Sequence, residues 1–363
     1  MIDIMELSLA LNEFRKYISD KKVICYGAGL QGTRAIAYFE NWDLQDRIDA
    51  FIDSNNQKWG GLKEYHGLKY PIISIEEAIK RILPDTVIVV TNIDVINIYK
   101  NIKKIDEFKT VPVTSLISIA EQELRISNYD SIVEEGDKPL IPNVIHYCWF
   151  GGEMPDQQKR VVEGWHDKCP DYEIKEWNES NYDINQNKYM VHAAENNAWA
   201  FVSDYARMDV VYKYGGFYFD TDVEILKNLD DLRYQKGFVT VDVTLLVNLG
   251  SGFGTISGHK LLSELMRLYE HRHFDRTPCQ LLQYEFYRQQ GYEITDRLQR
   301  ICDANVYPMI LQSTCAHSMK MRVSDKAYFA HYGTGLWEQG SDWKNARKAF
   351  SDNSSNELIT YKI

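Results

Sequence analysis

The sequence predicts an α/β protein built on parallel sheets and divided into two domains. The length of 363 residues exceeds what one hydrophobic core usually organises. Short apolar runs such as residues 23–26 and 86–90 alternate with amphipathic stretches of helical period such as 199–214. Alternating strands and helices imply parallel pairing. The expected divisions are a domain at residues 1–130, a domain at 140–340 and a polar tail at 341–363.

Charge and cysteine usage narrow the class of function. The formal net charge of -11 argues against a nucleic-acid binder, because no cationic surplus exists to displace counterions from a phosphate backbone. The six cysteines include no Cys-x-x-Cys pair, so neither a zinc cage nor a disulfide framework is indicated. The first 22 residues lack the apolar stretch of a signal peptide, and we expect no transmembrane segment and a cytoplasmic location.

The first domain opens with a glycine-rich turn between a strand and a helix. An apolar strand at 23–26 leads into Gly27-x-Gly29-x-x-Gly32, and a helical pattern follows through Phe39. The next strand, at 48–52, ends at Asp53, where a dinucleotide-binding fold places an acid for the ribose. This order resembles a Rossmann-like unit. The glycines serve either a nucleotide site or the packing of helix on strand, and both interpretations stay open.

The second domain repeats the alternation after a polar, charged segment at 127–142. We expect strands at 143–150 and 172–177 and a helix at 199–214 whose buried stripe includes Tyr214. Gly215 and Gly216 supply its left-handed stop, and the strand 217–219 follows at once.

Two acids stand at the end of that strand, in Asp220-Thr221-Asp222. Extended geometry would place both side chains on one side, roughly 6 to 7 Å apart at the backbone, so that they converge on one cation. Oxygen ligands favour Mg²⁺ or Mn²⁺. Such a cation would bridge the phosphates of a sugar nucleotide and stabilise the departing diphosphate. By itself, an Asp-x-Asp triplet more often marks a solvated turn.

The preceding helix carries Ser203-Asp204-Tyr205-Ala206-Arg207. Asp204 and Arg207 are three apart and therefore neighbours on one helix surface. Taken alone, this pair predicts a surface ion pair of about 0.2 to 0.5 kcal/mol.

Taken together, these stretches resemble glycosyltransferase family 32, a group of DxD sugar transferases similar to capsular-polysaccharide enzymes and, more distantly, to the clostridial glucosylating toxins. The resemblance covers roughly residues 140–340. It is carried by four stretches: IPNVIHYCWFGG (141–152), CPDYEIKEWNESNYDI (169–184), AFVSDYARMDVVYKYGGFYFDTDVEIL (200–226) and NLGSGFG (248–254).

The resemblance implies a GT-A-like fold and a retaining, metal-dependent transferase. The implied partners are a nucleotide-diphosphate sugar donor, commonly of uridine or guanosine, and a saccharide or lipid-linked oligosaccharide acceptor. The implied cofactor is Mn²⁺ or Mg²⁺. The implied role is capsular or cell-surface polysaccharide synthesis, carried out in the cytoplasm or at the inner face of the cell membrane.

Site residues follow from the resemblance by position. Asp204 and Arg207 match catalytic residues that hold the sugar hydroxyls and the scissile region, and Arg207 could also offset leaving-group charge. Asp222 matches the most direct metal ligand, and Asp220 matches a residue that contacts both metal and nucleotide. The other matching substrate-binding positions are Trp149, which stacks on the nucleobase, Ser203, Tyr218 and Asn248.

A last stretch, residues 330–337, resembles the family's closing His-Tyr-x-x-Ser-Trp element. His331 and Trp337 match its substrate-binding positions, where the element covers the diphosphate and completes the metal shell. The chain departs from the pattern at Leu336, which replaces the serine, and the spacing is one residue longer. Thr334 is the candidate substitute for the missing hydroxyl.

Three other classes of function compete with this prediction. The glycine turn suits a nicotinamide-dependent sugar-nucleotide oxidoreductase or epimerase, which needs a positioned acid–base group such as Tyr-x-x-x-Lys. A glycoside hydrolase would recruit Asp220 with Asp222 or Glu224, although neighbouring acids on one strand end are too close for that geometry. A sugar-binding module without turnover is the third alternative.

Overall fold

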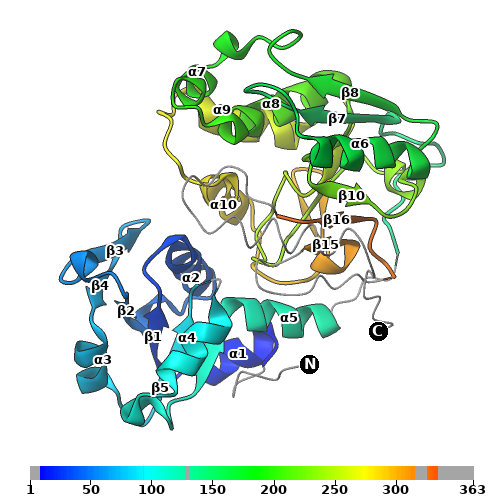
Figure 1. Ribbon diagram of the computed structural model, residues 1–363. Coiled ribbons are helices and arrows are strands. Elements are labelled where there is room, and N and C mark those ends of the chain that lie inside the picture. Colours follow the sequence, from blue (N-terminus) through cyan, green and yellow to red (C-terminus); the bar gives the residue numbers. More distant parts are fainter. Residues whose placement is uncertain (1–8, 93, 127–130, 315–324, 334–363) are drawn as a thin grey trace. The chain divides into compact units, whose positions relative to one another are not determined.

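The computed structural model describes residues 9–92, 94–126, 131–314 and 325–333, which form a mixed α/β fold with parallel strands (Figure 1). This confirms the predicted fold class. The chain divides into two compact units. Unit 1 comprises Met1–Ile126 with Glu293–Thr295, and unit 2 comprises Ser127–Tyr292 with Asp296–Ile363.

Unit 1 is built on a six-stranded sheet in the order β3-β4-β2-β1-β5-β6. Its strands are β1 (Lys22–Tyr26), β2 (Ile48–Ile52), β3 (Leu62–Tyr65), β4 (Leu68–Ile73), β5 (Thr86–Val90) and β6 (Val113–Ser115). All neighbours run parallel except the hairpin of β3 with β4. Its helices are α1 (Leu11–Ile18), α2 (Leu30–Asn41), η1 (Gln45–Arg47), η2 (Asn56–Lys58), α3 (Ile75–Arg81), α4 (Val95–Ile102), η3 (Asp106–Phe108) and α5 (Leu116–Ile126).

The three glycines of the turn after β1 differ in how closely other atoms approach them. A Cβ at Gly27 would lie 2.5 Å from the Thr91 carbonyl oxygen, and φ there is 121°. A Cβ at Gly32 would lie 2.6 Å from the carbonyl oxygen of Gly27. At Gly29, a Cβ would meet no atom within 4 Å. Close packing therefore explains Gly27 and Gly32 and does not explain Gly29.

Asp53, the acid after β2, is engaged by its own unit. Its carboxylate accepts the backbone N–H of Ala28 at 3.0 Å and of Asn55 at 2.9 Å. The Lys58 ammonium lies 2.8 Å from the same carboxylate. Burial alone would raise the pKa of Asp53, but Lys58 and the two N–H donors lower it overall. Asp53 thus ties the glycine turn to the end of β2.

Unit 2 is built on a seven-stranded mixed sheet in the order β13-β14-β11-β12-β9-β7-β8. Its strands are β7 (Val144–Cys148), β8 (Glu173–Trp177), β9 (Gly216–Tyr218), β11 (Gly237–Thr240), β12 (Phe253–Thr255), β13 (Gln299–Ile301) and β14 (Ala304–Tyr307). Strand β7 runs parallel to both β8 and β9. A separate sheet has the order β10-β16-β15, with β10 (Val223–Ile225), β15 (Gln312–Thr314) and β16 (Phe329–His331).

The helices of unit 2 are α6 (Asp156–Lys168), η4 (Ile184–Gln186), α7 (Lys188–Glu195), α8 (Trp199–Tyr214), η5 (Asp230–Arg233), α9 (Lys260–Glu270), α10 (Cys279–Gln289) and η6 (Met309–Leu311). Helix α8 has the predicted bounds, and Val202, Ala206 and Val210 are fully buried. Tyr214 was expected on the same buried stripe, and this is wrong because its side chain is 51% exposed. It lies at the last turn and stacks on Trp177, with 5.4 Å between ring centroids.

A buried histidine fixes the joint between α8 and β9. The indole N–H of Trp177 donates to Nδ1 of His146 at 3.1 Å, and an indole nitrogen can only donate. His146 therefore carries its proton on Nε2, which donates to the Gly215 carbonyl oxygen at 2.8 Å. Gly215 has a φ of 67°, and a Cβ at Gly216 would lie 2.6 Å from the Val144 carbonyl oxygen. The neutral ring thus holds the residues from which β9 starts.

In the part of the chain that the structure describes, no helix combines the length and the apolar character that a membrane crossing requires. The cysteines of that part, Cys25, Cys148, Cys169, Cys279 and Cys302, all carry free thiols.

Replacing Gly32 by alanine should destabilise unit 1 by about 1 to 3 kcal/mol, because the added methyl group is forced against the Gly27 carbonyl. Hydrogen exchange of the β1 and β2 amides in the full chain measures the loss. Gly29→Ala is the matched control and should leave protection unchanged. Equal losses in the two variants would contradict a packing role specific to Gly32.

Lowering the pH should destabilise unit 2 through His146. Burial lowers the pKa of His146 from 6.5 to about 4 in the folded protein. The unfolded chain takes up the proton first, so stability present above pH 6.5 is lost as the pH falls toward 4, by about 3 kcal/mol. We measure the free energy of unfolding by denaturant at several pH values. Between pH 6.5 and 4 it should fall less steeply with decreasing pH in His146→Gln than in the wild type.

Comparing slopes between variants removes the contribution of other groups, such as Asp204, whose pKa is raised to about 6 and which acts in the opposite direction. His166 on α6 is exposed and provides the control. The unfolding free energy of His166→Gln should depend on pH as that of the wild type does. A wild-type slope in His146→Gln would contradict the assignment.

Candidate functional site

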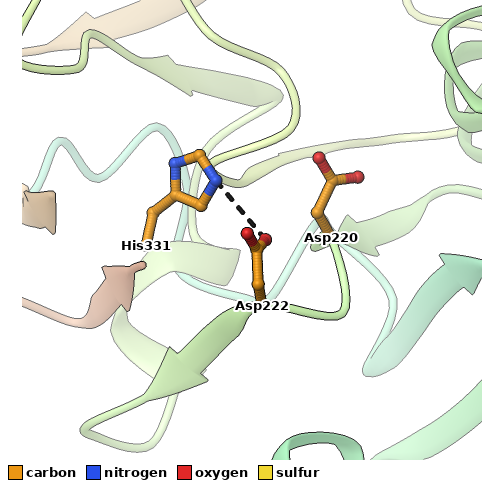
Figure 2. Close-up of side chains that lie close together, drawn as sticks. All are labelled: Asp220, Asp222 and His331. Carbon is orange, nitrogen blue, oxygen red and sulfur yellow. Dashed lines mark ion pairs between the residues drawn. The ribbon is translucent and has the colours of Figure 1, made fainter. Parts of the chain in front are cut away.

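The two aspartates of the DxD triplet lie in a tight turn between β9 and β10. The backbone N–H of Val223 donates to the carbonyl oxygen of Asp220 at 3.0 Å and closes the turn. The expected extended geometry is therefore wrong. The chain stays extended only to Asp220, whose N–H donates to the Gly250 carbonyl oxygen at 3.1 Å, and then reverses into β10. The side chains of Asp220 and Asp222 nevertheless point to the same side (Figure 2).

A buried arginine joins α8 to this turn. Nη2 of Arg207 lies 3.2 Å from Oδ1 of Asp204 and 3.3 Å from Oδ1 of Asp220. The side chains of Arg207 and Asp204 are only 5% and 9% exposed, so the pair is not the surface ion pair that the spacing alone predicts. Tyr218 completes the group, because its hydroxyl donates to Oδ1 of Asp220 at 2.9 Å. The arginine is thus shared between a helix residue and a turn residue.

Burial controls the protonation of this group. It raises the pKa of Asp204 to about 6, against the opposing effect of the Arg207 guanidinium. Burial also raises the pKa of Asp220, again opposed by Arg207. For the Tyr218 phenol, burial and the charge of Asp220 both raise the pKa far above the ordinary value, which keeps the hydroxyl protonated as a donor. The Arg207 cation offsets the negative charge of the buried Asp204 and of the half-buried Asp220.

His331 reaches the turn from a distant part of the chain. Strand β16 pairs antiparallel with β10, and this register sets His331 opposite Val223. Nε2 of His331 lies 3.4 Å from Oδ1 of Asp222. Asp220, Asp222 and His331 each offer a ligand atom, and these atoms all lie within 4.8 Å of one another. Burial lowers the pKa of His331, but the Asp222 carboxylate outweighs it and the net pKa is raised.

The loop before β12 supports the turn from the other side. The Asn248 side chain accepts the N–H of Gly250 at 3.0 Å and donates to Oδ2 of Asp242 at 2.9 Å. A Cβ at Gly250 would lie 2.3 Å from Oδ2 of Asp220, so a side chain there would displace the Asp220 carboxylate. Asn248 therefore organises the loop against which Asp220 rests.

The structure brings some of the predicted site residues together and leaves others apart. Asp204, Arg207, Tyr218 and Asp220 form one connected network, and Asp222 with His331 lies beside it. The Trp149 indole donates to the Gly152 carbonyl oxygen at 3.0 Å and packs against the core of unit 2. The Ser203 hydroxyl donates to the Trp199 carbonyl oxygen at 3.3 Å. Trp337, Thr334 and Leu336 lie outside the described residues.

Sequence reasoning missed three residues that shape the site, namely His146, Gly250 and Ser251. All three lie inside stretches that carry the family resemblance, which was the available signal. Their roles depend on contacts far apart in sequence, such as the one between Ser251 and His331, and no local pattern reports such contacts.

The Tyr-x-x-x-Lys spacing of an oxidoreductase occurs twice in unit 1 after the glycines. Tyr65 and Lys69 fall in the β3–β4 hairpin, where Lys69 pairs with Glu64 at 3.1 Å. Tyr99 and Lys103 fall at the end of α4, where the Lys103 ammonium donates to three carbonyl oxygens, including that of Val111 at 2.8 Å. Both lysines are engaged in local structure.

One family model matches a part of unit 2. Residues 155–239 match the family model described as the glycosyltransferase sugar-binding region containing a DXD motif. The stretch that carries Asp220 and Asp222 is thus similar to that of DXD glycosyltransferases.

The curated relatives include three inositol phosphoceramide mannosyltransferases of Schizosaccharomyces pombe (strain 972 / ATCC 24843). Number 3 is 27% identical over 144 residues, which are 38% of this chain and 40% of the relative. Number 2 is 30% identical over 123 residues, which are 33% of this chain and 36% of the relative. Number 1 is 25% identical over 170 residues, which are 42% of this chain and 51% of the relative. The chain therefore spans between 36% and 51% of the length of these relatives.

Two solved structures are also similar. PaToxG glycosyltransferase has a TM-score of 0.31 and 16% identity, covering 49% of this chain and 70% of its own. A glycosyltransferase involved in the glycosylation of the major capsid of PBCV-1 has a TM-score of 0.33 and 9% identity, covering 58% of this chain and all of its own.

Gly250→Ala should weaken divalent cation binding about 10- to 100-fold, because the methyl group displaces the Asp220 carboxylate from its place in the cluster. Calorimetric titration of the full chain with Mn²⁺ measures the change. Gly164→Ala on α6 is the matched control, since a Cβ there meets no atom within 4 Å. An unchanged affinity in Gly250→Ala, with the fold intact, would show that Asp220 takes no part in cation binding.

Proposed function

We propose that the protein is a metal-dependent glycosyltransferase that moves a sugar from a nucleotide-diphosphate donor to a saccharide acceptor. One observation carries the proposal: ligand atoms of Asp220, Asp222 and His331 lie within 4.8 Å of one another. The two aspartates stand in a region that matches DXD glycosyltransferases. The cluster also follows the carboxyl end of β9, where α/β sheets present ligand crevices.

The donor set fits the proposed cation. Two carboxylates suit Mg²⁺ or Mn²⁺, and the imidazole nitrogen favours Mn²⁺ of the two, because Mg²⁺ takes oxygen ligands almost exclusively. Asp220, Asp222 and His331 would hold the ion. When bound, it supplies Lewis-acid stabilisation of the diphosphate leaving group.

The remaining residues of the network orient the donor. Arg207 is fixed by Asp204 and Asp220, so its guanidinium needs no reorganisation to offset negative charge nearby. The Arg207 guanidinium also lies 5.2 Å from the centre of the Tyr218 ring, which limits its movement. In this proposal, Asp204 and Arg207 hold the sugar and the scissile region, and Trp149 stacks on the base.

The names of the relatives guide the choice of donor and acceptor. The curated relatives are mannosyltransferases that act on inositol phosphoceramide, so a mannose nucleotide is the first donor to test. The resemblance to capsule enzymes points to a saccharide or lipid-linked oligosaccharide acceptor in cell-surface polysaccharide synthesis, with retention of configuration. Proton NMR of the first product anomer tests retention.

Metal dependence separates the transferase from its rivals. A hydrolase that works with paired carboxylates stays active in a chelator, whereas this transferase should lose turnover in EDTA and regain it with Mn²⁺. A binding module would bind the donor without releasing nucleotide diphosphate. An oxidoreductase would bind a reduced nicotinamide nucleotide stoichiometrically and couple it to turnover.

Asp222→Asn should lower turnover by orders of magnitude while the fold persists, because it removes charge from the cation site and no volume from the core. Release of nucleotide diphosphate, measured across a panel of nucleotide sugars with Mn²⁺, gives the rate. Asp171→Asn, at an exposed position of the same unit, should match the wild type. Unchanged turnover in folded Asp222→Asn would overturn the proposed function.

A further inference from the structure

Ser251 places a buried hydroxyl against the imidazole of His331. Its side chain is fully buried, and Oγ lies 2.9 Å from Nδ1 of His331, which is 80 residues away in sequence. The backbone N–H of Ser251 donates to the Asn248 carbonyl oxygen at 3.2 Å. The other ring nitrogen of His331 faces Asp222 at 3.4 Å. Each imidazole nitrogen therefore has one side-chain partner.

We infer that Ser251 is a positioning residue of the cation site, whose hydroxyl holds Nδ1 of His331 and thereby directs Nε2 toward Asp222 and the cation. The inference rests on the proposed function. A histidine that ligates a metal usually donates its other N–H to a fixed partner, which sets both the tautomer and the ring orientation. Ser251 occupies that place.

A hydroxyl suits this position because it can both donate and accept. In the structure, Nε2 of His331 faces the Asp222 carboxylate and Nδ1 faces the Ser251 hydroxyl. If Nε2 ligated a cation, Nδ1 would carry the ring proton and the Ser251 hydroxyl would accept it. One hydroxyl can therefore serve Nδ1 whether or not that nitrogen carries a proton.

The loop that carries Ser251 also supports the turn that carries Asp220. The Gly250 carbonyl oxygen accepts the N–H of Asp220 at 3.1 Å, and Asn248 is fixed by Asp242. One loop, residues 248–251, therefore positions a ligand residue from β16 and a ligand residue from the β9–β10 turn. The two residues come from distant segments, and this loop contacts both of them.

The test is a double-mutant cycle on Mn²⁺ affinity, measured by calorimetry on the full chain. Ser251→Ala should weaken binding about 10-fold or more, as loss of an outer partner does elsewhere. In a His331→Ala background, the same change should cost nothing further, because Ser251 acts only through the imidazole. Ser257→Ala is the control and should match the wild type. It also removes a serine hydroxyl, but one that donates to backbone carbonyl oxygens and not to His331.

Thermal unfolding establishes that each variant is folded, and Ser251→Cys replaces the alanine variant if that one is not. Equal losses of affinity in both backgrounds would overturn the inference, because they would show a general structural role. An unchanged affinity in Ser251→Ala would overturn it as well. Both results leave the proposed function standing, whereas a wild-type protein without affinity for Mn²⁺ would overturn the proposed function itself.

Discussion

The balance of charge around three neighbouring aspartates is the constraint on which this site depends. Asp204 and Asp220 share the Arg207 guanidinium at 3.2 and 3.3 Å, and Asp222 faces His331 at 3.4 Å. Buried carboxylates without such partners would take up protons, because burial disfavours their charged form. The arrangement of α8, the turn and β16 keeps each acid next to a basic group. Everything proposed for the site requires these acids to remain able to ionise.

The backbone around the turn is shaped by the same requirement for close approach. Gly250 leaves room for the Asp220 carboxylate, and its carbonyl oxygen fixes the Asp220 backbone. His146 holds the Gly215 carbonyl oxygen at 2.8 Å, where β9 begins, through a ring that must stay neutral. The position of the aspartates is therefore determined by contacts on both strands that flank β9, namely β7 and the approach to β12. Strand β9 has only three residues, so these contacts add to the few ladder hydrogen bonds that such a short strand can form.

Local patterns predicted the elements well and the site less completely. Helix α8 and strands β2 and β5 have the predicted bounds, since β-branched runs and a terminal glycine are read from neighbouring residues alone. The extended aspartates and the buried Tyr214 were wrong, because the chain reverses at Asp220 and the last turn of α8 is exposed. The contact of Arg207 with Asp220 could not be predicted from spacing, which offered only the local partner Asp204. Such contacts depend on how distant segments pack.

The two aspartates of the triplet are not equivalent, and the difference follows from their partners. Oδ1 of Asp220 receives both the Tyr218 hydroxyl and the Arg207 guanidinium, so much of its charge is already compensated within the protein. Asp222 faces an imidazole, a weaker and removable source of positive charge. A cation that enters the cluster would compete with Arg207 for the Asp220 carboxylate and with His331 for the Asp222 carboxylate. Asp220 also fixes the turn, because its backbone N–H donates to Gly250 and its carbonyl oxygen accepts from Val223.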